Sequence, residues 1–413
     1  MGINGKYFMP KCFYLILILF LSCSDQKNEN NEDKDVYFSK VFGEYDAEMG
    51  YSIHPTSDGG YIISGATSSY WATDSLPRRV ALPAHGVTDA IIAKIDRYGD
   101  PEWIKTYGGE QYESAFNAKQ TNDGGYFFAG YNSSTGAGLY DFWLVKLDNQ
   151  GTIAWQKTYG TANADIGFYG DITSDNGFIL TGYSVPENRM DKDILLIKTD
   201  GEGNELWSHT FGDYLSQSGT FLQETDDSGF IVIGETIGSS TQTDIILLKT
   251  DHNGIEEWRR VISEPGSDVP YAIKQTNNGY IMVATTTSMG EGNKDIFLIS
   301  FGLDGNIIWQ KTYGGPALEY GVDVILDDDG YVLTGSTSSY GTMFYDMWII
   351  KVDLGGEIIW DEIYSGTNID IGRAIVNNQS GGFTVLGQTS SYGAGEFDFW
   401  VLKVDENGIV PDQ

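Results

Sequence analysis

Two series of residues in this sequence have the side-chain types that acid–base chemistry requires. In the first, an aspartate is followed five residues later by a lysine, and this spacing recurs six times. A carboxylate beside an amine could serve as general base and general acid. A residue that returns in every repeat, however, serves the repeat, whereas a functional site breaks the pattern. We therefore interpret the aspartates as hydrogen-bonded to loop backbone and the lysines as lying along their strands. The pairs are Asp89 and Lys94, Asp141 and Lys146, Asp193 and Lys198, Asp244 and Lys249, Asp346 and Lys351, and Asp398 and Lys403, whereas Asp295 is followed by Ser300.

The second series is acidic and stands at the start of the expected first strand of each repeat. Its members are Glu48, Glu113, Asp165, Asp268, Glu319 and Asp370, with Gln217 at the seventh position. If the first strand is innermost, these groups crowd the mouth of a channel. Carboxylates that converge repel one another unless they are hydrogen-bonded, protonated or bound to a cation. The sequence favours backbone hydrogen bonding and leaves a bound cation open.

Motifs for other chemistries do not occur in the sequence. There is no GxSxG, HExxH or GxxxxGK[ST] motif and no GxGxxG after a strand, and the four histidines lack metal-ligand spacing. Both cysteines lie within the first 25 residues, so the folded part has no cysteine nucleophile or thiolate metal site. We predict no catalytic residue, no metal and no cofactor. A carboxylate pair that cleaves glycosides stays open, because three-dimensional separation defines it.

These residues belong to a unit that the chain repeats seven times. The phrase "DGGY" at residues 58–61 returns in related form six times. The aromatic residues that close the phrases are Tyr61, Tyr126, Phe178, Phe230, Tyr280, Tyr331 and Phe383. They are 65, 52, 52, 50, 51 and 52 residues apart, so only the first repeat carries an insertion.

Each unit predicts four short strands. In the second unit these are residues 114–121, 126–133, 141–148 and 152–159, separated by turns and one loop. The third strand is nearly continuous in apolar residues, which indicates that both of its faces are covered. Four-stranded units that repeat seven times predict an all-β fold, a seven-bladed β-propeller over residues 36–410.

The two ends of the chain complete one blade. The last unit stops before its fourth strand, whereas the segment "FSKVFG" at residues 38–43 precedes the first unit. It matches the fourth strands "WIKTYG" and "WQKTYG" found elsewhere. We therefore predict that this N-terminal strand closes the ring as the outer strand of the last blade.

The succession of "DGGY", "DxWxxKxD" and "GxxxWxKTYG" resembles a family of bacterial secreted and lipoprotein β-propellers. The resemblance covers nearly all of residues 36–410, and the fifth unit departs from it at Ser300 and Gly302. It implies the propeller fold and, because some members are labelled endoglucanase-like, a link to glycan cleavage.

One tryptophan stands outside the repeats. Nine of the ten occupy recurring positions and are expected to pack between blades, whereas Trp71 lies in the insertion of the first unit. Loops between the second and third strands vary and are rich in aromatic residues, which suits ligand binding. Packing of the insertion over the ring is the alternative. The predicted ligand-binding residues are Tyr70, Trp71, Arg78, Arg79, His85, Tyr140, Tyr340, Tyr345 and Tyr392.

The N-terminus predicts export and lipidation. Lysines precede a short apolar run that ends at Ser22 and Cys23, which indicates a signal peptide over residues 1–22. The residues before Cys23 resemble a lipobox, so we predict a lipidated Cys23 and a flexible tether over residues 23–35. A chance cysteine beside an ordinary cleavage site is the alternative. The predicted location is the outer membrane, on either the cell surface or the periplasmic side.

Charge narrows the range of partners. The net charge is −33 without a long basic run, which argues against nucleic acid and against membrane contact other than through a lipid. We predict a monomer that binds a glycan or a protein on its loop face. The alternative is a glycan-cleaving hydrolase, and a purely structural role is not separable from binding at this stage.

Overall fold

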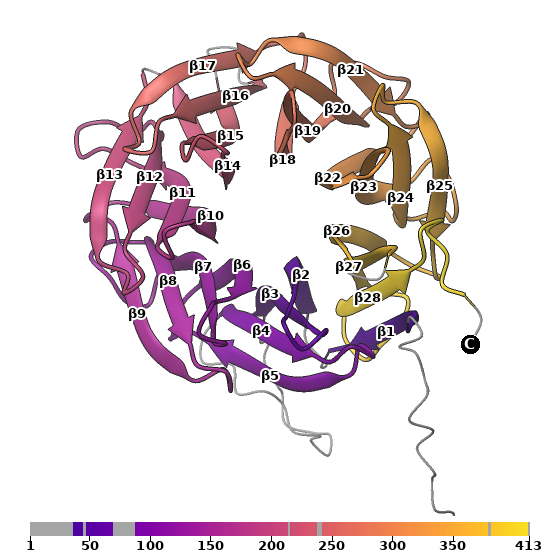
Figure 1. Cartoon of the computed structure of the whole chain (residues 1–413), viewed down its shortest axis with the longest axis horizontal. Helices are drawn as coiled ribbons and strands as arrows, with labels where there is room; N and C mark the ends of the chain where they lie inside the picture. Colours follow the sequence, from indigo (N-terminus) through magenta and orange to yellow (C-terminus); the bar gives the residue numbers. More distant parts are fainter. Residues whose placement is uncertain are drawn as a thin grey trace, which may run out of the picture. The chain divides into compact units, whose positions relative to one another are not determined.

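The seven repeats and the N-terminal strand fold into seven four-stranded antiparallel sheets, which stand as blades around an axis (Figure 1). The computed structural model describes residues 36–43, 47–68, 87–213, 215–237, 242–378 and 381–411. The predicted all-β, seven-bladed propeller is confirmed. In the second blade, the observed strands begin within one residue of the predicted ones.

Within a blade the strands follow one another from the axis to the rim. The first blade contains β2 (Ala47–Pro55), β3 (Tyr61–Ser68), β4 (Asp89–Ile95) and β5 (Pro101–Tyr107). The second contains β6 (Glu113–Gln120), β7 (Tyr126–Asn132), β8 (Asp141–Leu147) and β9 (Ile153–Tyr159). The third contains β10 (Asp165–Ile172), β11 (Phe178–Ser184), β12 (Asp193–Thr199) and β13 (Glu205–Phe211). The fourth contains β14 (Ser216–Glu224), β15 (Phe230–Ile237), β16 (Thr243–Thr250) and β17 (Glu256–Ile262).

The remaining blades keep this order. The fifth contains β18 (Asp268–Thr276), β19 (Gly279–Thr286), β20 (Asp295–Gly302) and β21 (Ile307–Tyr313). The sixth contains β22 (Glu319–Asp327), β23 (Gly330–Thr337), β24 (Asp346–Asp353) and β25 (Ile358–Tyr364). The seventh contains β26 (Asp370–Asn377), β27 (Phe383–Thr389), β28 (Asp398–Val404) and, as its outer strand, β1 (Phe38–Phe42).

Strand β1 closes the ring as predicted. It pairs with β28 in antiparallel register, with Phe38 opposite Lys403 and Phe42 opposite Phe399 (Figure 1). The Phe38 ring is 5% exposed and lies over Gly99 of the first blade, where an added Cβ would come within 2.5 Å of it. Chain ends joined in one sheet leave no open repeat edge.

The fourth-strand tryptophans make the same contact from one blade to the next. Gly151 lies in the turn between β8 and β9 of the second blade, and a Cβ added there would lie 2.9 Å from the ring of Trp103 in the first blade. The Gly151 backbone also has a φ of 74°, which favours glycine. Phe38 therefore takes the place of a tryptophan at the closure. The prediction that this series packs between blades is confirmed for the described residues.

The recurring aspartates and lysines are structural, as expected. Asp141 Oδ2 accepts hydrogen bonds from the backbone N–H groups of Ala137 and Gly138, at 2.9 and 3.2 Å. Lys146 Nζ lies 2.8 Å from Asp123 Oδ2 and donates to the carbonyl of Leu147. Equivalent lysine–aspartate pairs occur in other blades. In these five blades the lysine thus ties the third strand to the connection between the first two strands.

The second acidic series lies between blades and does not crowd the channel. Glu113 is fully buried and accepts backbone N–H groups of Gly109 and Ser134, at 2.8 and 2.9 Å, which confirms the expected backbone hydrogen bonding. It also lies near Asp89 of the preceding blade, because a Cβ on Gly108 would be 2.7 Å from Glu113 Oε2 and 2.0 Å from Asp89 Oδ1. None of the series lines the cavity described below. The loop N–H groups hold the carboxylates at the junctions.

We call each such couple, a third-strand aspartate and the first-strand acid of the next blade, an acid pair. The junction of the third and fourth blades departs from this arrangement. There Gln217 replaces the first-strand acid, and Asp193 forms an ion pair with Arg189. Where the second carboxyl is missing, an arginine supplies a positive charge to the remaining one.

Candidate functional site

Every innermost strand carries a β-bulge at the same place. In β2 the register with β3 shifts between Gly50 and Ser52, which leaves Tyr51 as an extra residue. A bulge turns a side chain that regular alternation would direct elsewhere. The seven extra residues are Tyr51, Phe116, Phe168, Thr220, Tyr271, Val322 and Arg373.

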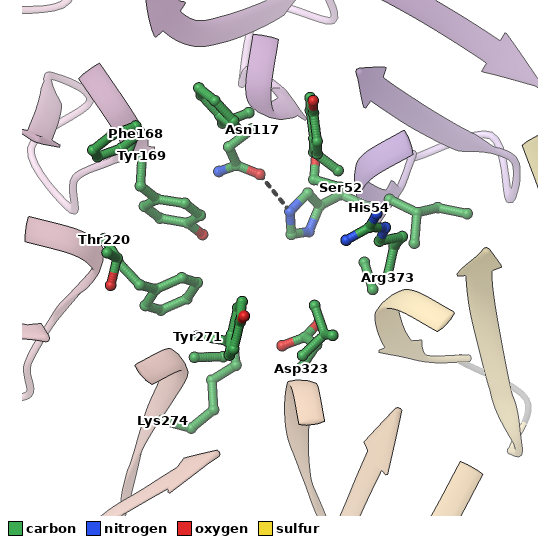
Figure 2. A pocket seen from close by; sticks show the side chains of 17 residues that line it. Ser52, His54, Asn117, Phe168, Tyr169, Thr220, Tyr271, Lys274, Asp323 and Arg373 are labelled. Carbon is green, nitrogen blue, oxygen red and sulfur yellow. Dashed lines mark hydrogen bonds between the residues drawn. The ribbon is translucent and has the colours of Figure 1, made fainter. Parts of the chain in front are cut away.

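All seven bulge residues line one cavity, which lies where the innermost strands of the seven blades meet. Figure 2 shows labelled lining residues from different blades around this space. The volume of this axial cavity is about 280 Å³. That value is close to the lower end of the range for small-molecule sites, roughly 300–1,000 Å³.

Aromatic side chains form much of the lining from the first to the fifth blade. The rings of Tyr51 and Phe116 lie 4.9 Å apart between centroids, and Phe168 follows at 5.8 Å from Phe116. Tyr169 and Phe221 form a second couple at 4.2 Å. Tyr271 adds a further ring from β18. Such surfaces suit a flat apolar group.

Two basic side chains from the fifth and seventh blades complete the lining. Arg373 donates from Nε to Gln388 Oε1 at 2.8 Å. Lys274 Nζ lies 4.8 Å from the centroid of the Phe221 ring. Burial lowers the pKa of both groups, because it removes water from a charged form. Arginine nevertheless stays charged at neutral pH.

The other polar residues of the cavity are held by the protein. Asp323 accepts backbone N–H groups of Val324 and Ile375, at 2.9 and 3.0 Å, and burial raises its pKa. His54 bonds through Nε2 to Asn117 Oδ1 at 2.8 Å (Figure 2). Burial lowers the pKa of His54 well below 6.5, so its imidazole is neutral at pH 7.

Four of the sequence-predicted binding residues lie in loops between second and third strands and do not line the axial cavity. Tyr340 is 42% exposed, but its hydroxyl donates to the Gly314 carbonyl at 3.0 Å. Tyr392 donates likewise to the Ser365 carbonyl at 3.1 Å. The remaining two pack against tyrosines of first or second strands: Tyr140 against Tyr131, and Tyr345 against Tyr320.

These four residues belong to the second, sixth and seventh blades. Burial raises the pKa of Tyr345 to about 12. The other predicted residues lie outside the described part of the chain. They are Tyr70, Trp71, Arg78, Arg79, His85 and the lipidation candidate Cys23.

Reasoning from the sequence missed the bulge residues. A signal was present, because the position three residues after the second acidic series differs between repeats, whereas the position before it is glycine in five of the seven. It holds tyrosine twice, phenylalanine twice, threonine, valine and arginine. What the sequence did not give was the direction of these side chains, which depends on the bulge.

Comparisons with known proteins found similarity in structure alone. No protein-family model matches the chain, and no curated protein matches it either. The chain is similar in structure to a protein of unknown function from Dyadobacter fermentans, at 12% identity and a TM-score of 0.48, over 90% of this chain and 98% of that one. It is also similar to the β-propeller domain of the Trilobed protease from Pyrococcus furiosus, at 11% identity and a TM-score of 0.48, over 87% and 94% of the two chains. A third similar structure is BBS1N in complex with ARL6DN, at 7% identity and a TM-score of 0.49, over 90% and 97%.

Two further observations concern membranes and metals. The described residues contain no helix with the length and hydropathy needed to cross a lipid bilayer. Within the same residues, no group of three or more histidine, cysteine, aspartate or glutamate side chains is arranged to hold a metal ion.

Proposed function

We propose that this protein is a binding protein that takes a small ring-containing molecule into its axial cavity. The observation that carries the proposal is the set of bulge residues. Most of the blade repeats because it serves the fold, whereas the bulge position differs between blades and places its side chains in one space. Different side chains that converge on one cavity suit a ligand of lower symmetry than the ring.

Binding at the loop face is the second candidate. Met343 and Phe344, between β23 and β24, are 94% and 47% exposed. Exposed apolar groups on loops suit a glycan or protein partner. The lipobox-like segment at Cys23 supports a lipid anchor, so we further propose that the propeller is held at the outer membrane.

Hydrolysis of a glycan receives less support from the cavity. The described lining residues include one carboxylate, Asp323, and both of its oxygens accept backbone N–H groups. A glycosidase needs two carboxyl groups that flank the scissile bond. The geometry therefore favours binding over cleavage.

Filling the cavity tests the proposal. Thr220 sits at a bulge and lines the cavity, so Thr220→Trp should occupy much of the space. Thr210→Trp, at an exposed site on β13, is the matched control. The ligands are two sets of matched compounds: benzoate, benzamide and benzamidine, and indole-3-acetate, indole-3-acetamide and tryptamine.

We expect at least one of these compounds to bind the wild type and the control, measured by calorimetry, and to bind Thr220→Trp at least ten-fold more weakly. Melting curves would establish that both variants are folded. If no compound binds the wild type better than the folded Thr220→Trp variant, the axial cavity is not the binding site.

A further inference from the structure

Neither basic group of the axial cavity forms a salt bridge among the described residues. Arg373 forms its hydrogen bond with the neutral Gln388, and Lys274 faces the Phe221 ring. The charge of Asp323 acts on Lys274 from the same lining, whereas the groups that act on Arg373 are two tyrosines, Tyr51 and Tyr271. Water-poor surroundings penalise a charge that lacks a counter-charge. An anionic ligand would remove this penalty.

A lysine on another innermost strand, Lys119, does form a salt bridge. Lys119 Nζ lies 2.7 Å from Asp171 Oδ2, and it is not among the cavity-lining residues. The chain carries a net charge of −33, so acidic partners are plentiful elsewhere. The cavity lining instead holds two basic groups and one acid, Asp323. Ionised in their usual forms, they leave one positive charge, which a monoanion would balance.

The rest of the lining favours an aromatic body over a sugar. Ser52 Oγ is already bonded to Ser64 and to the N–H of Ala118. Asn117 is bonded to His54 and to the Gly170 carbonyl. A sugar would therefore find few free partners for its hydroxyl groups, and buried unpaired hydroxyls are unfavourable. A flat ring needs only the aromatic surfaces described above.

Resting on the proposed function, we infer that the ligand is a small aromatic monocarboxylate. Its carboxylate meets Arg373, Lys274 adds a second positive charge to the same cavity, and its ring packs between the aromatic residues of the other blades. The guanidinium group suits this role because it can bind a carboxylate through two parallel hydrogen bonds.

The matched compounds test the charge. We expect benzoate or indole-3-acetate to bind the wild type at least ten-fold more tightly than the corresponding amide and the corresponding cation, benzamidine or tryptamine. Arg373→Gln and Lys274→Met should each weaken binding of the acid at least ten-fold and leave binding of the amide within two-fold. Arg259→Gln, on the outer strand β17, is the control that should change neither. Melting curves of both cavity variants establish that they are folded, and two variants keep the test decisive if one does not fold.

The outcomes separate this inference from the proposed function. If the amide binds as tightly as the acid and Thr220→Trp blocks both, the cavity binds ligands but the inferred charge is wrong. If galacturonate binds more tightly than benzoate, the aromatic body is wrong. If inorganic phosphate or chloride displaces the acid at equal concentration, the cavity is a simple anion site and the inference fails. If Thr220→Trp changes no binding, the proposed function fails with it.

Discussion

Replacing Asp141 by asparagine should stabilise the propeller at neutral pH. Asp141 is 1% exposed, and its Oδ1 has no hydrogen-bond partner among the described residues. Asp165 of the next blade is fully buried, and its Oδ1 also has no hydrogen-bond partner among the described residues. The carbonyl oxygen of an asparagine can keep the N–H bonds of Ala137 and Gly138. Its amide can then donate to the carboxylate of Asp165.

The size of the expected change in the free energy of unfolding follows from these contacts. A buried unsatisfied polar atom costs about 1–3 kcal/mol, and a new hydrogen bond contributes roughly 1 kcal/mol net. Because the amide also needs room, we expect a gain of about 1–2 kcal/mol at pH 8. In a propeller of this size the melting temperature should rise by about 1–3 °C.

The gain should depend on pH. Burial, and then the charge of Asp165, raise the pKa of Asp141 above its ordinary value of 3.8. A raised pKa means that the folded state keeps the proton, so this stability is present at low pH and is lost as the pH rises through the folded-state pKa. Asparagine has no proton to lose. The difference between variant and wild type should therefore be small near pH 4 and reach its full size near pH 8.

Urea unfolding at both pH values is the assay, and Asp148→Asn is the control. Backbone N–H groups of Thr152 and Gln150 lower the pKa of Asp148, so its stabilising effect has the opposite sign, present at neutral pH and lost in acid. That control should gain no stability at pH 8. If Asp141→Asn destabilises the protein equally at both pH values, the charged form of Asp141 carries no penalty in the folded state and our reasoning is wrong.

Further predictions concern the closure, the anchor and the loop face. Phe38→Ala should lower the free energy of unfolding by about 3–5 kcal/mol, because it removes a buried ring from the closing blade. Lys40→Ala removes only a solvent-accessible ion pair with Asp100 and should lower it by less than about 1 kcal/mol. Equal urea midpoints for the two variants would contradict the role of Phe38 in the closure. A fatty-acid probe should label the wild type and not Cys23→Ala, and equal labelling of both would end the lipoprotein proposal. For a glycan or protein recovered in a binding screen on residues 36–413, Trp71→Ala should weaken binding by about 1–3 kcal/mol with an unchanged melting curve. A fall in stability with unchanged affinity would instead make Trp71 a packing residue.

Most of the fold could be predicted from the sequence because each blade repeats the same local sequence pattern. Aromatic residues such as Tyr126 begin second strands, and Asp141 begins a third strand, as expected. The match between the segment around Phe38 and the fourth strands predicted the closure, which the pairing of β1 with β28 confirms. Because the same sequence pattern recurs in every repeat, a strand assigned in one repeat supports the assignment of the equivalent strand in the others.

The candidate site could not be predicted in the same way. Strict alternation along β2 gives no reason for Tyr51 to face the axis, because the bulge inserts an extra residue and shifts the register. The acids were visible as an aligned series, yet sequence could not tell whether Glu113 faces the channel or its neighbouring blade. That choice depends on N–H groups of loops such as the one at Gly109.

The sequence by itself thus determined the blade, the number of blades and the closing strand, all of which follow from local patterns that recur. Only the tertiary structure decided which residues share the axial cavity. Arg373 and Lys274 lie 99 residues apart in the chain and come from different blades. They line one space because ring closure brings seven innermost strands around a common axis. No local sequence pattern shows that two residues so far apart in the chain share a cavity.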